Sequence, residues 1–166
     1  MSSDELSVGI GEMKIANNTT ILNCQALGSC IAVFLFEPTL KVGAVAHIML
    51  PSSCESKKDD NQIEGKKSAK FADIAIRDMI QALHRKGADK QSLIAKIVGG
   101  AHMFKIRKNF VNDIGLRNVM AAKTILNYER IAIVAEDTGG DYGRTVRFST
   151  ANGKAEVRSV QGEKEI

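Results

Sequence analysis

The first third of the chain alternates short apolar runs with turn residues, a pattern that predicts a series of β-strands. The two longest runs, 30–36 and 42–50, are apolar at nearly every position, and a proline follows each of them, at Pro38 and Pro51. Proline cannot donate a ladder hydrogen bond, so we expect both strands to end there. A strand that is apolar along its whole length is typical of a sheet covered on both faces.

Two later segments show the apolar period of amphipathic helices. The first helix is expected over about 69–86, with Ser68 as its N-cap. The second is expected over about 114–127, where Asn112 or Asp113 can cap the first turn. Two helices of this kind can cover one face of a sheet, which is what the apolar strands require.

The second half of the chain also contains strands. A two-residue turn at Asn152-Gly153, flanked by alternating sequences, is a strong hairpin signal. The strands that we expect in this half lie at 93–98, 131–135, 145–148 and 155–160. Because strands outnumber helices, the predicted fold is a mixed α/β layered sandwich.

Two polar segments lack any apolar period. Residues 52–68 are rich in lysine and include Gly65, and we expect a mobile surface loop there. Residues 161–166 are expected to form a frayed tail. With 166 residues in total, the whole chain, 1–166, is predicted to be a single domain.

Composition excludes several classes of protein. A content of 44% hydrophobic and 25% charged residues suits a globular domain that needs neither disulfides nor metal to fold. The net charge of +4 arises from intermixed acids and bases without a basic stripe, so nucleic-acid binding is not expected. The longest unbroken apolar run, 30–36, is far shorter than the ~20 residues that a membrane-spanning helix needs, so membrane insertion is not expected.

The three cysteines show no CxxC spacing, and their number is odd. Free thiols are typical of a reducing compartment, and the acidic N-terminus lacks the features of a signal peptide. We therefore expect a cytoplasmic protein. No His, Cys and Asp residues occur at metal-ligand spacing, so neither a metal nor a cofactor is predicted.

Candidate chemistry centres on one cysteine and one histidine. Cys30 follows the turn at Gly28-Ser29, which delivers the chain into a strand and can expose a thiol at the end of a sheet. A thiol with an ordinary pKa of roughly 8.5 needs a base at neutral pH. His47 interrupts an apolar strand and is either a satisfied core histidine or that base, if the two strands are neighbours. The alternative for Cys30 is a small buried hydrophobic residue.

Two glycine-containing motifs carry less information. Gly99-Gly100-Ala101 resembles a phosphate-binding turn but lacks the further residues of a dinucleotide or P-loop motif. Nucleotide binding is therefore not expected. A single Asp137-Thr138-Gly139 triplet is better explained as a turn than as part of an aspartic-protease site.

Six short motifs also occur in order along nearly the whole chain. They are Gly9-Ile10-Gly11-Glu12, Leu27-Gly28-Ser29-Cys30, His47-Ile48-Met49-Leu50-Pro51, Gly99-Gly100-Ala101-His102-Met103-Phe104, Ile114-Gly115-Leu116-Arg117-Asn118 and Ala135-Glu136-Asp137-Thr138-Gly139-Gly140. Each motif is weak alone, but six in register are specific. Together they resemble the CheD family of chemoreceptor glutamine deamidases.

The resemblance implies a three-layer α/β/β sandwich with mixed sheets and the two main helices on one face. It implies deamidation of receptor glutamines to glutamate and ammonia, with no cofactor. The nucleophile of the family falls on Cys30 and its histidine on His47. We expect backbone N–H groups of the turn at Gly28, Ser29 and Cys30 to bind the oxyanion. A third catalytic position, threonine in the family, is Cys24 here. A thiol is a weaker hydrogen-bond partner than a hydroxyl, so Cys24 would orient His47 less firmly unless a backbone carbonyl does so.

The resemblance also implies protein partners. These are the cytoplasmic domains of chemoreceptors, as substrate, and CheC, a phosphatase of the response regulator CheY. Met103 and Phe104 are candidate apolar anchors for CheC, and the alternative is that Phe104 folds back as a core plug. We expect a monomer. Two functions stay open: a working deamidase, or a regulatory protein that binds receptors and CheC but has lost turnover through the change at Cys24.

Overall fold

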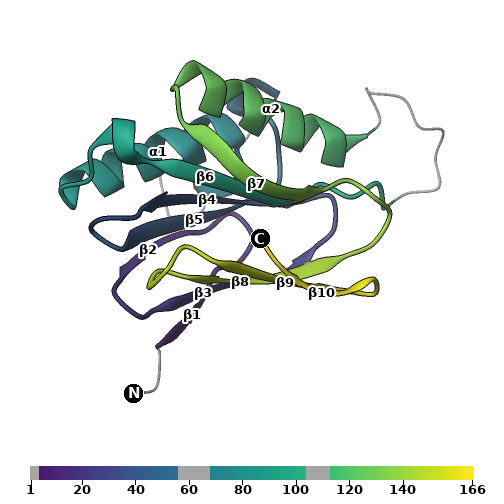
Figure 1. Ribbon diagram of the computed structural model, residues 1–166. Coiled ribbons are helices and arrows are strands. Elements are labelled where there is room, and N and C mark those ends of the chain that lie inside the picture. The colour runs from purple at the N-terminus through teal and green to yellow at the C-terminus, as the bar shows by residue number, and fades with distance from the viewer. Residues whose placement is uncertain (1–3, 56–67, 104–112) are drawn as a thin grey trace.

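Two five-stranded sheets are stacked face to face, and two helices cover the outer side of one of them (Figure 1). These layers are seen in a computed structural model that describes residues 4–55, 68–103 and 113–166. The arrangement confirms the three-layer α/β/β sandwich with both main helices on one face.

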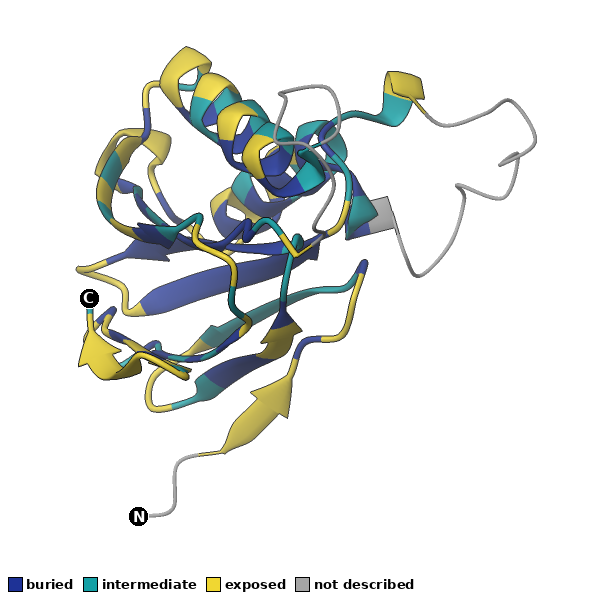
Figure 2. Cartoon of the chain, turned by 90° about the vertical axis from the view of Figure 1, so that its right-hand side faces the viewer, coloured by how far each residue is buried: buried dark blue, intermediate teal, exposed yellow. Residues whose placement is uncertain are grey.

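The sheet in the middle of the sandwich, called here the central sheet, has the strand order β2-β5-β4-β6-β7. Only the β6–β7 pair is parallel, so the sheet is mixed. Every residue of β4 and β5 is buried, as their apolar sequences predict (Figure 2). The strands are β2 Met13–Asn17, β4 Ile31–Glu37, β5 Val42–Ile48, β6 Ile94–Gly99 and β7 Ala132–Thr138.

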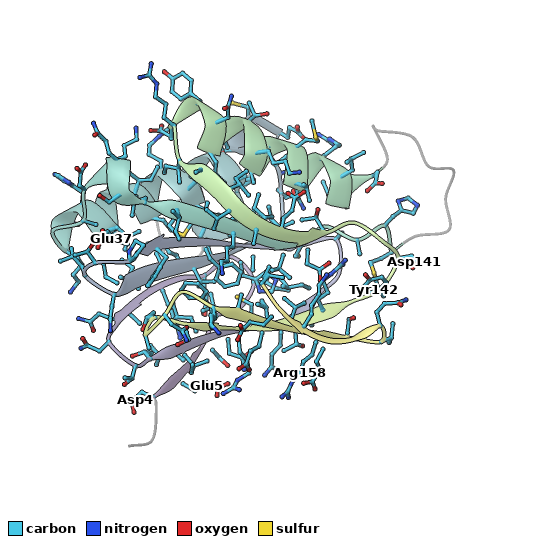
Figure 3. The ribbon with its side chains drawn as sticks, viewed as in Figure 1. Asp4, Glu5, Glu37, Asp141, Tyr142 and Arg158 are labelled. Atoms are coloured by element: carbon cyan, nitrogen blue, oxygen red, sulfur yellow. The ribbon has the colours of Figure 1, made fainter. Side chains whose placement is uncertain are left out.

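The second sheet, called the outer sheet, has the order β1-β3-β8-β9-β10. Its far face carries charged side chains, among them Glu5 and Arg158 (Figure 3). A bulge interrupts the pairing of β3 with β8 between Cys24 and Leu27. The strands are β1 Glu5–Ser7, β3 Ile21–Leu27, β8 Arg144–Ser149, β9 Ala155–Ser159 and β10 Gly162–Glu165.

The prediction of a frayed tail over 161–166 is wrong. Residues Gly162–Glu165 form β10, which pairs antiparallel with β9, and Ile166 exchanges two backbone hydrogen bonds with Ala155. All four residues of β10 are exposed, so the strand leaves no apolar pattern in the sequence. Backbone pairing and an ion pair between Arg158 and Glu163 hold it instead.

The two main helices are α1, Ala72–Arg85, and α2, Ile114–Tyr128. Asp113 caps α2 as predicted, because its carboxylate accepts a hydrogen bond from the N–H of Leu116. The prediction for α1 is wrong at its start, since its N-cap is Phe71 and not Ser68. Phe71 is fully buried, and packing of this ring fixes the start of the helix without a side-chain cap.

Short 3₁₀ helices and one hairpin complete the described chain. The hairpin at Asn152-Gly153 joins β8 to β9 as predicted, through a loop in which the N–H of Gly153 donates to the carbonyl of Ser149. The predicted loop 52–68 begins and ends in 3₁₀ turns, and its residues 56–67 lie outside the described part of the chain. The 3₁₀ helices are η1 Ser53–Glu55, η2 Ser68–Lys70 and η3 Lys90–Ser92.

The side chains of the central sheet divide between two cores. On β4, residues such as Ile31 and Val33 face the helices, whereas Ala32 and Phe34 face the outer sheet. The ring of Phe34 lies 4.9 Å from that of Phe148, between centroids, in the layer between the sheets. This alternation decides which residues near the ends of β4 and β5 share a face.

Candidate active site

Cys30 and His47 lie on the same face of the central sheet. In the β4–β5 ladder Ala32 is opposite His47, and Cys30 precedes Ala32 by two residues. Because side chains alternate along a strand, both point into the layer between the sheets. Such diagonal neighbours lie about 7–8 Å apart between Cα atoms, a distance that side chains can span.

Cys30 stands where the chain enters β4. Its side chain is half-buried and packs against the core between the sheets. Its carbonyl accepts a hydrogen bond of 2.9 Å from the N–H of Gly100, which fixes the backbone on this side. Burial raises the pKa of the Cys30 thiol, although a hydrogen bond from its own backbone N–H acts in the opposite direction. The sulfur therefore carries its proton at neutral pH.

His47 is 1% exposed and lies in the interior. Its Nδ1 lies 3.3 Å from the carbonyl oxygen of Val8. A carbonyl only accepts, so Nδ1 carries the proton and Nε2 is the basic nitrogen. Within the described residues, Nε2 has no hydrogen-bond partner. Burial lowers the pKa of His47, while the Val8 carbonyl and the charge of Glu12 oppose this shift. The ring is therefore a neutral base.

The connection between β1 and β2 forms hydrogen bonds with both backbone groups of His47. The N–H of Gly11 donates to the carbonyl of His47, and the N–H of His47 donates to the carbonyl of Glu12. The carboxylate of Glu12 accepts from the N–H of Gly9 at 2.9 Å and closes the turn. Sequence reasoning assigned no role to Val8 or Glu12, although the Gly9–Glu12 motif marked this turn.

Cys24 lies on β3 of the outer sheet, fully buried in the core between the sheets. Burial raises the pKa of its thiol to about 12, so the group stays protonated. Its side chain packs in the same layer that Cys30 and His47 face.

The turn before Cys30 is held by its backbone carbonyls. The carbonyl of Gly28 accepts a hydrogen bond of 2.8 Å from Ala101, and that of Ser29 accepts one of 3.0 Å from Asn118. The side chain of Met103 is 46% exposed and packs against Gly28, where an added Cβ would lie 3.1 Å from its Cγ. Phe104 lies outside the described residues.

Gly99 and Gly100 follow β6 and lie against the backbone of Cys30. Gly99 has φ +111°, and an added Cβ would come within 2.4 Å of the carbonyl oxygen of Cys30. Glycine is therefore needed here for a close backbone approach. This contact explains Gly99 without a phosphate ligand, whereas an added Cβ at Gly100 would meet Val119 on α2 at 2.4 Å.

A cavity of about 200 Å³ opens beside this region, between the ends of β6 and β7 and the start of α2. His102 and Asp113 both line it and contact each other, with 3.2 Å between Nδ1 and Oδ2. Gly100 lines this cavity, but Cys30 and His47 do not.

None of the helices in residues 4–55, 68–103 and 113–166 has the length and apolar character needed to span a membrane. In the same ranges no three His, Cys, Asp or Glu side chains cluster as a metal site.

The fold and the site define a class: an α/β/β-sandwich protein with a thiol and an imidazole on one face of its central sheet. The chain belongs to the CheD family, whose model, described as CheD chemotactic sensory transduction, matches residues 49–159. It is 41% identical over 161 residues to a protein of Clostridium novyi, with 96% of each chain covered. It is 42% identical over 158 residues to one of Archaeoglobus fulgidus, with 95% of each covered. Both relatives are named probable chemoreceptor glutamine deamidase CheD.

Proposed function

We propose that the chain is a protein-glutamine deamidase that converts glutamine side chains of chemoreceptors to glutamate with release of ammonia. The names of relatives about 40% identical over nearly the whole chain support this activity. The observation that carries the proposal is the placement of Cys30 and His47 on one face of adjacent strands, with the basic Nε2 of His47 unpartnered within the described residues.

In the first step the sulfur of Cys30 attacks the carboxamide carbon of the glutamine. Because burial keeps the thiol protonated and the imidazole neutral, Nε2 of His47 takes the thiol proton during the attack. The new C–S bond gives a tetrahedral intermediate. Backbone N–H groups at Ser29 and Cys30 are proposed to stabilise its oxyanion.

In the second step protonated His47 transfers its proton to the amide nitrogen. The C–N bond then breaks, ammonia leaves, and a thioester on Cys30 remains. His47, neutral again, takes a proton from a water molecule that attacks the thioester carbon. The C–S bond breaks, the sulfur regains the proton from His47, and glutamate is released. All the atoms come from the protein, the substrate and water, so the reaction uses no cofactor.

Partner contacts belong to the same proposal. Met103 is exposed and packs against the turn before Cys30, so a partner bound there would lie beside the site. We place the contact for a CheC-type phosphatase at Met103 and Phe104. The protein is proposed to act as a cytoplasmic monomer on the cytoplasmic domains of receptors.

The test uses ammonia release from a receptor cytoplasmic fragment, together with mass spectrometry of its glutamine peptides. Cys30→Ala and His47→Ala should abolish deamidation and keep the native circular dichroism spectrum. The matched control is Cys54→Ala, which removes an exposed thiol and should retain full activity. An active Cys30→Ala protein would contradict the mechanism. A wild-type protein that binds the fragment but releases no ammonia would support a purely regulatory role.

A further inference from the structure

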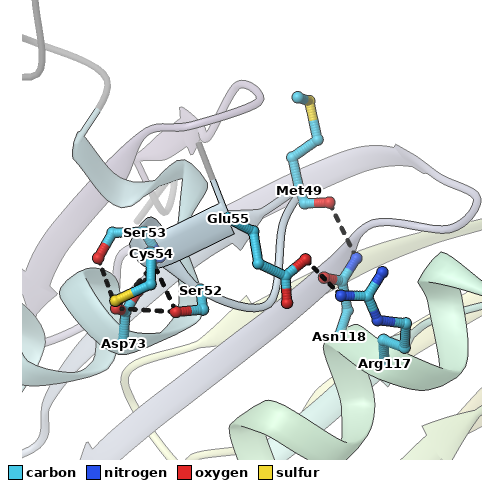
Figure 4. A network of polar contacts seen from close by, with 8 residues as sticks. All are labelled: Met49, Ser52, Ser53, Cys54, Glu55, Asp73, Arg117 and Asn118. Atoms are coloured by element: carbon cyan, nitrogen blue, oxygen red, sulfur yellow. Dashed lines mark hydrogen bonds and ion pairs between the residues drawn. The ribbon is translucent and has the colours of Figure 1, made fainter. Parts of the chain in front are cut away.

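Asn118 is fully buried on α2 and contacts both segments that bring the reacting groups together. Its Nδ2 donates one hydrogen bond to the carbonyl of Ser29 and another to the carbonyl of Met49, each 3.0 Å long. The bond to Met49 is visible in Figure 4. Ser29 immediately precedes Cys30, and Met49 follows His47 by two residues. One amide group therefore joins the entrance of β4 to the exit of β5.

We infer that Asn118 is a positioning residue that sets the relative placement of Cys30 and His47, an inference that rests on the function proposed above. The β4–β5 ladder has its last pair at Ile31 and Ile48. Beyond this pair the chain enters the turn before Cys30 on one side and leaves towards Pro51 on the other. The two hydrogen bonds of Asn118 connect the two chain segments beyond this last pair, at the end of the sheet where Cys30 and His47 lie.

The amide of Asn118 has only one orientation that fits. Both of its neighbours are carbonyl oxygens, so the NH₂ group must face them. The Oδ1 atom is then buried and, among the described residues, has no hydrogen-bond partner. A leucine of similar volume would remove this unpaired acceptor but would also leave the carbonyls of Ser29 and Met49 without their donor. The donor bonds are what leucine cannot supply.

The segment after Met49 is also attached to the helices at neighbouring points. Arg117, next to Asn118 on α2, forms an ion pair with Glu55, and Asp73 on α1 accepts hydrogen bonds from Ser53 (Figure 4). These contacts attach residues 52–55 to α1 and α2. None of them involves Cys30 or the turn that precedes it. Within this network, only Asn118 contacts both the segment that precedes Cys30 and the segment that follows His47.

Loss of the two bonds should change turnover and leave binding of the receptor unaltered. A displacement of about 1 Å between reacting groups can lower the rate about 10²-fold. Asn118 is buried and therefore cannot contact a receptor directly. We expect Asn118→Leu to lower kcat by about 10- to 100-fold with an unchanged KM.

The experiment compares Asn118→Leu with Asn23→Leu in the full chain, with the receptor fragment as substrate. Asn23 is a matched control because it is also buried and its Oδ1 also lacks a partner within the described residues. Its Nδ2 bonds Glu5 on β1 of the outer sheet, and the group that bonds Val8 is its backbone carbonyl, which leucine keeps. Asn23→Leu should keep kcat within about twofold of wild type. A kcat for Asn118→Leu within twofold of wild type, or a loss equal to that in Asn23→Leu, would overturn the inference.

A second readout distinguishes positioning from a loss of stability. The rate of alkylation of Cys30 by iodoacetamide is measured against pH in a Cys54→Ala background. In Asn118→Leu the profile should move towards that of His47→Ala, because the imidazole would no longer be placed to take the proton of the thiol. If Asn118→Leu does not fold, Asn118→Ala provides the same comparison with a smaller side chain. An unchanged profile in the variant that folds would contradict the inference.

The outcomes also separate this inference from the proposed function. If Cys30→Ala is inactive while Asn118→Leu has normal turnover, only the positioning role fails. If Cys30→Ala still deamidates the receptor fragment, the proposed mechanism fails, whatever Asn118 does.

Discussion

The carbonyl oxygen of Val8 lies 3.3 Å from Nδ1 of His47 and accepts the hydrogen bond that orients the ring. The sequence alone suggested residue 24 for this role. Cys24 is buried in the core between the sheets, which His47 also faces, and its thiol is a weak hydrogen-bond partner. A backbone carbonyl is fixed by the fold and can orient an imidazole without help from a particular side chain.

The first prediction concerns Cys24. Cys24→Ala should keep kcat within about threefold of wild type, because the Val8 carbonyl orients His47 and a thiol contributes little as a hydrogen-bond partner. Loss of the buried sulfur should lower the free energy of unfolding by about 1–2 kcal/mol. Ammonia release and urea denaturation measure the two effects. A tenfold loss of kcat in a folded variant would show that the Cys24 thiol itself orients the ring.

The second prediction concerns the pH dependence of the reaction. Burial lowers the pKa of His47 below its ordinary value of 6.5. Protonation of Nε2 removes the general base, and a lowered pKa means that protonation requires a more acidic solution. The acid limb of kcat/KM should therefore fall below pH 6.5.

Two measurements check this pH dependence. The first is the profile of kcat/KM from acidic to neutral pH. The second is an NMR titration of His47 in Cys30→Ala, which follows the ring without the partner thiol. An acid limb at or above 6.5 in the rate profile would contradict the assignment of His47 as the base.

The parts of the fold that depend on apolar periodicity were predictable. The runs 30–36 and 42–50 correspond to β4 and β5, and the pairing of these neighbours places Cys30 and His47 on one face. Strand β10 was missed because its exposed, charged residues show no apolar alternation, and backbone pairing and ion pairs hold it instead.

The supporting contacts of the site were not predictable for a different reason. Val8 acts through its backbone carbonyl, which any residue supplies, so the side-chain pattern carries no signal for it. Asn118 acts on Ser29 and Met49, which are distant in the chain and become neighbours only in the folded sandwich. Its place in the Ile114–Asn118 motif marked the residue but not its partners.

The third prediction concerns Gly99, whose φ of +111° is unfavourable for other residues. Gly99→Ala should lower the free energy of unfolding by at least about 1–3 kcal/mol and reduce kcat, because the new Cβ would push against the carbonyl oxygen of Cys30. The matched control is Gly139→Ala, with φ +79° and open space for a Cβ. It should be destabilised by a similar backbone strain but keep its kcat. Equal kcat losses in both variants would argue against a specific contact with Cys30.

The fourth prediction concerns a buried ion pair beneath the turn between β7 and β8. Arg144 donates to Asp137 at 3.1 Å and to the carbonyl of Gly139 at 2.8 Å, and its guanidinium lies 4.4 Å from the ring centroid of Tyr142. Tyr142 is labelled in Figure 3. Arg144→Leu should lower the free energy of unfolding by about 3–5 kcal/mol, because the Asp137 carboxylate would stay buried without its main partner. Urea denaturation measures this loss, and the double variant with Asp137→Asn should recover part of it.

The same pair makes a contribution to stability that depends on pH. Burial raises the pKa of Asp137, but hydrogen bonds from Arg144 and Lys164 outweigh this and hold the pKa below its ordinary value of 3.8. A carboxylate with a lowered pKa in the folded state stabilises the fold fully above 3.8, and the stabilisation is lost as the pH falls through the folded-state pKa. Urea denaturation at a series of acidic pH values should show a smaller dependence on pH for Asp137→Asn than for wild type. Parallel curves for the two proteins would mean that Asp137 is not held in its charged form by the pair.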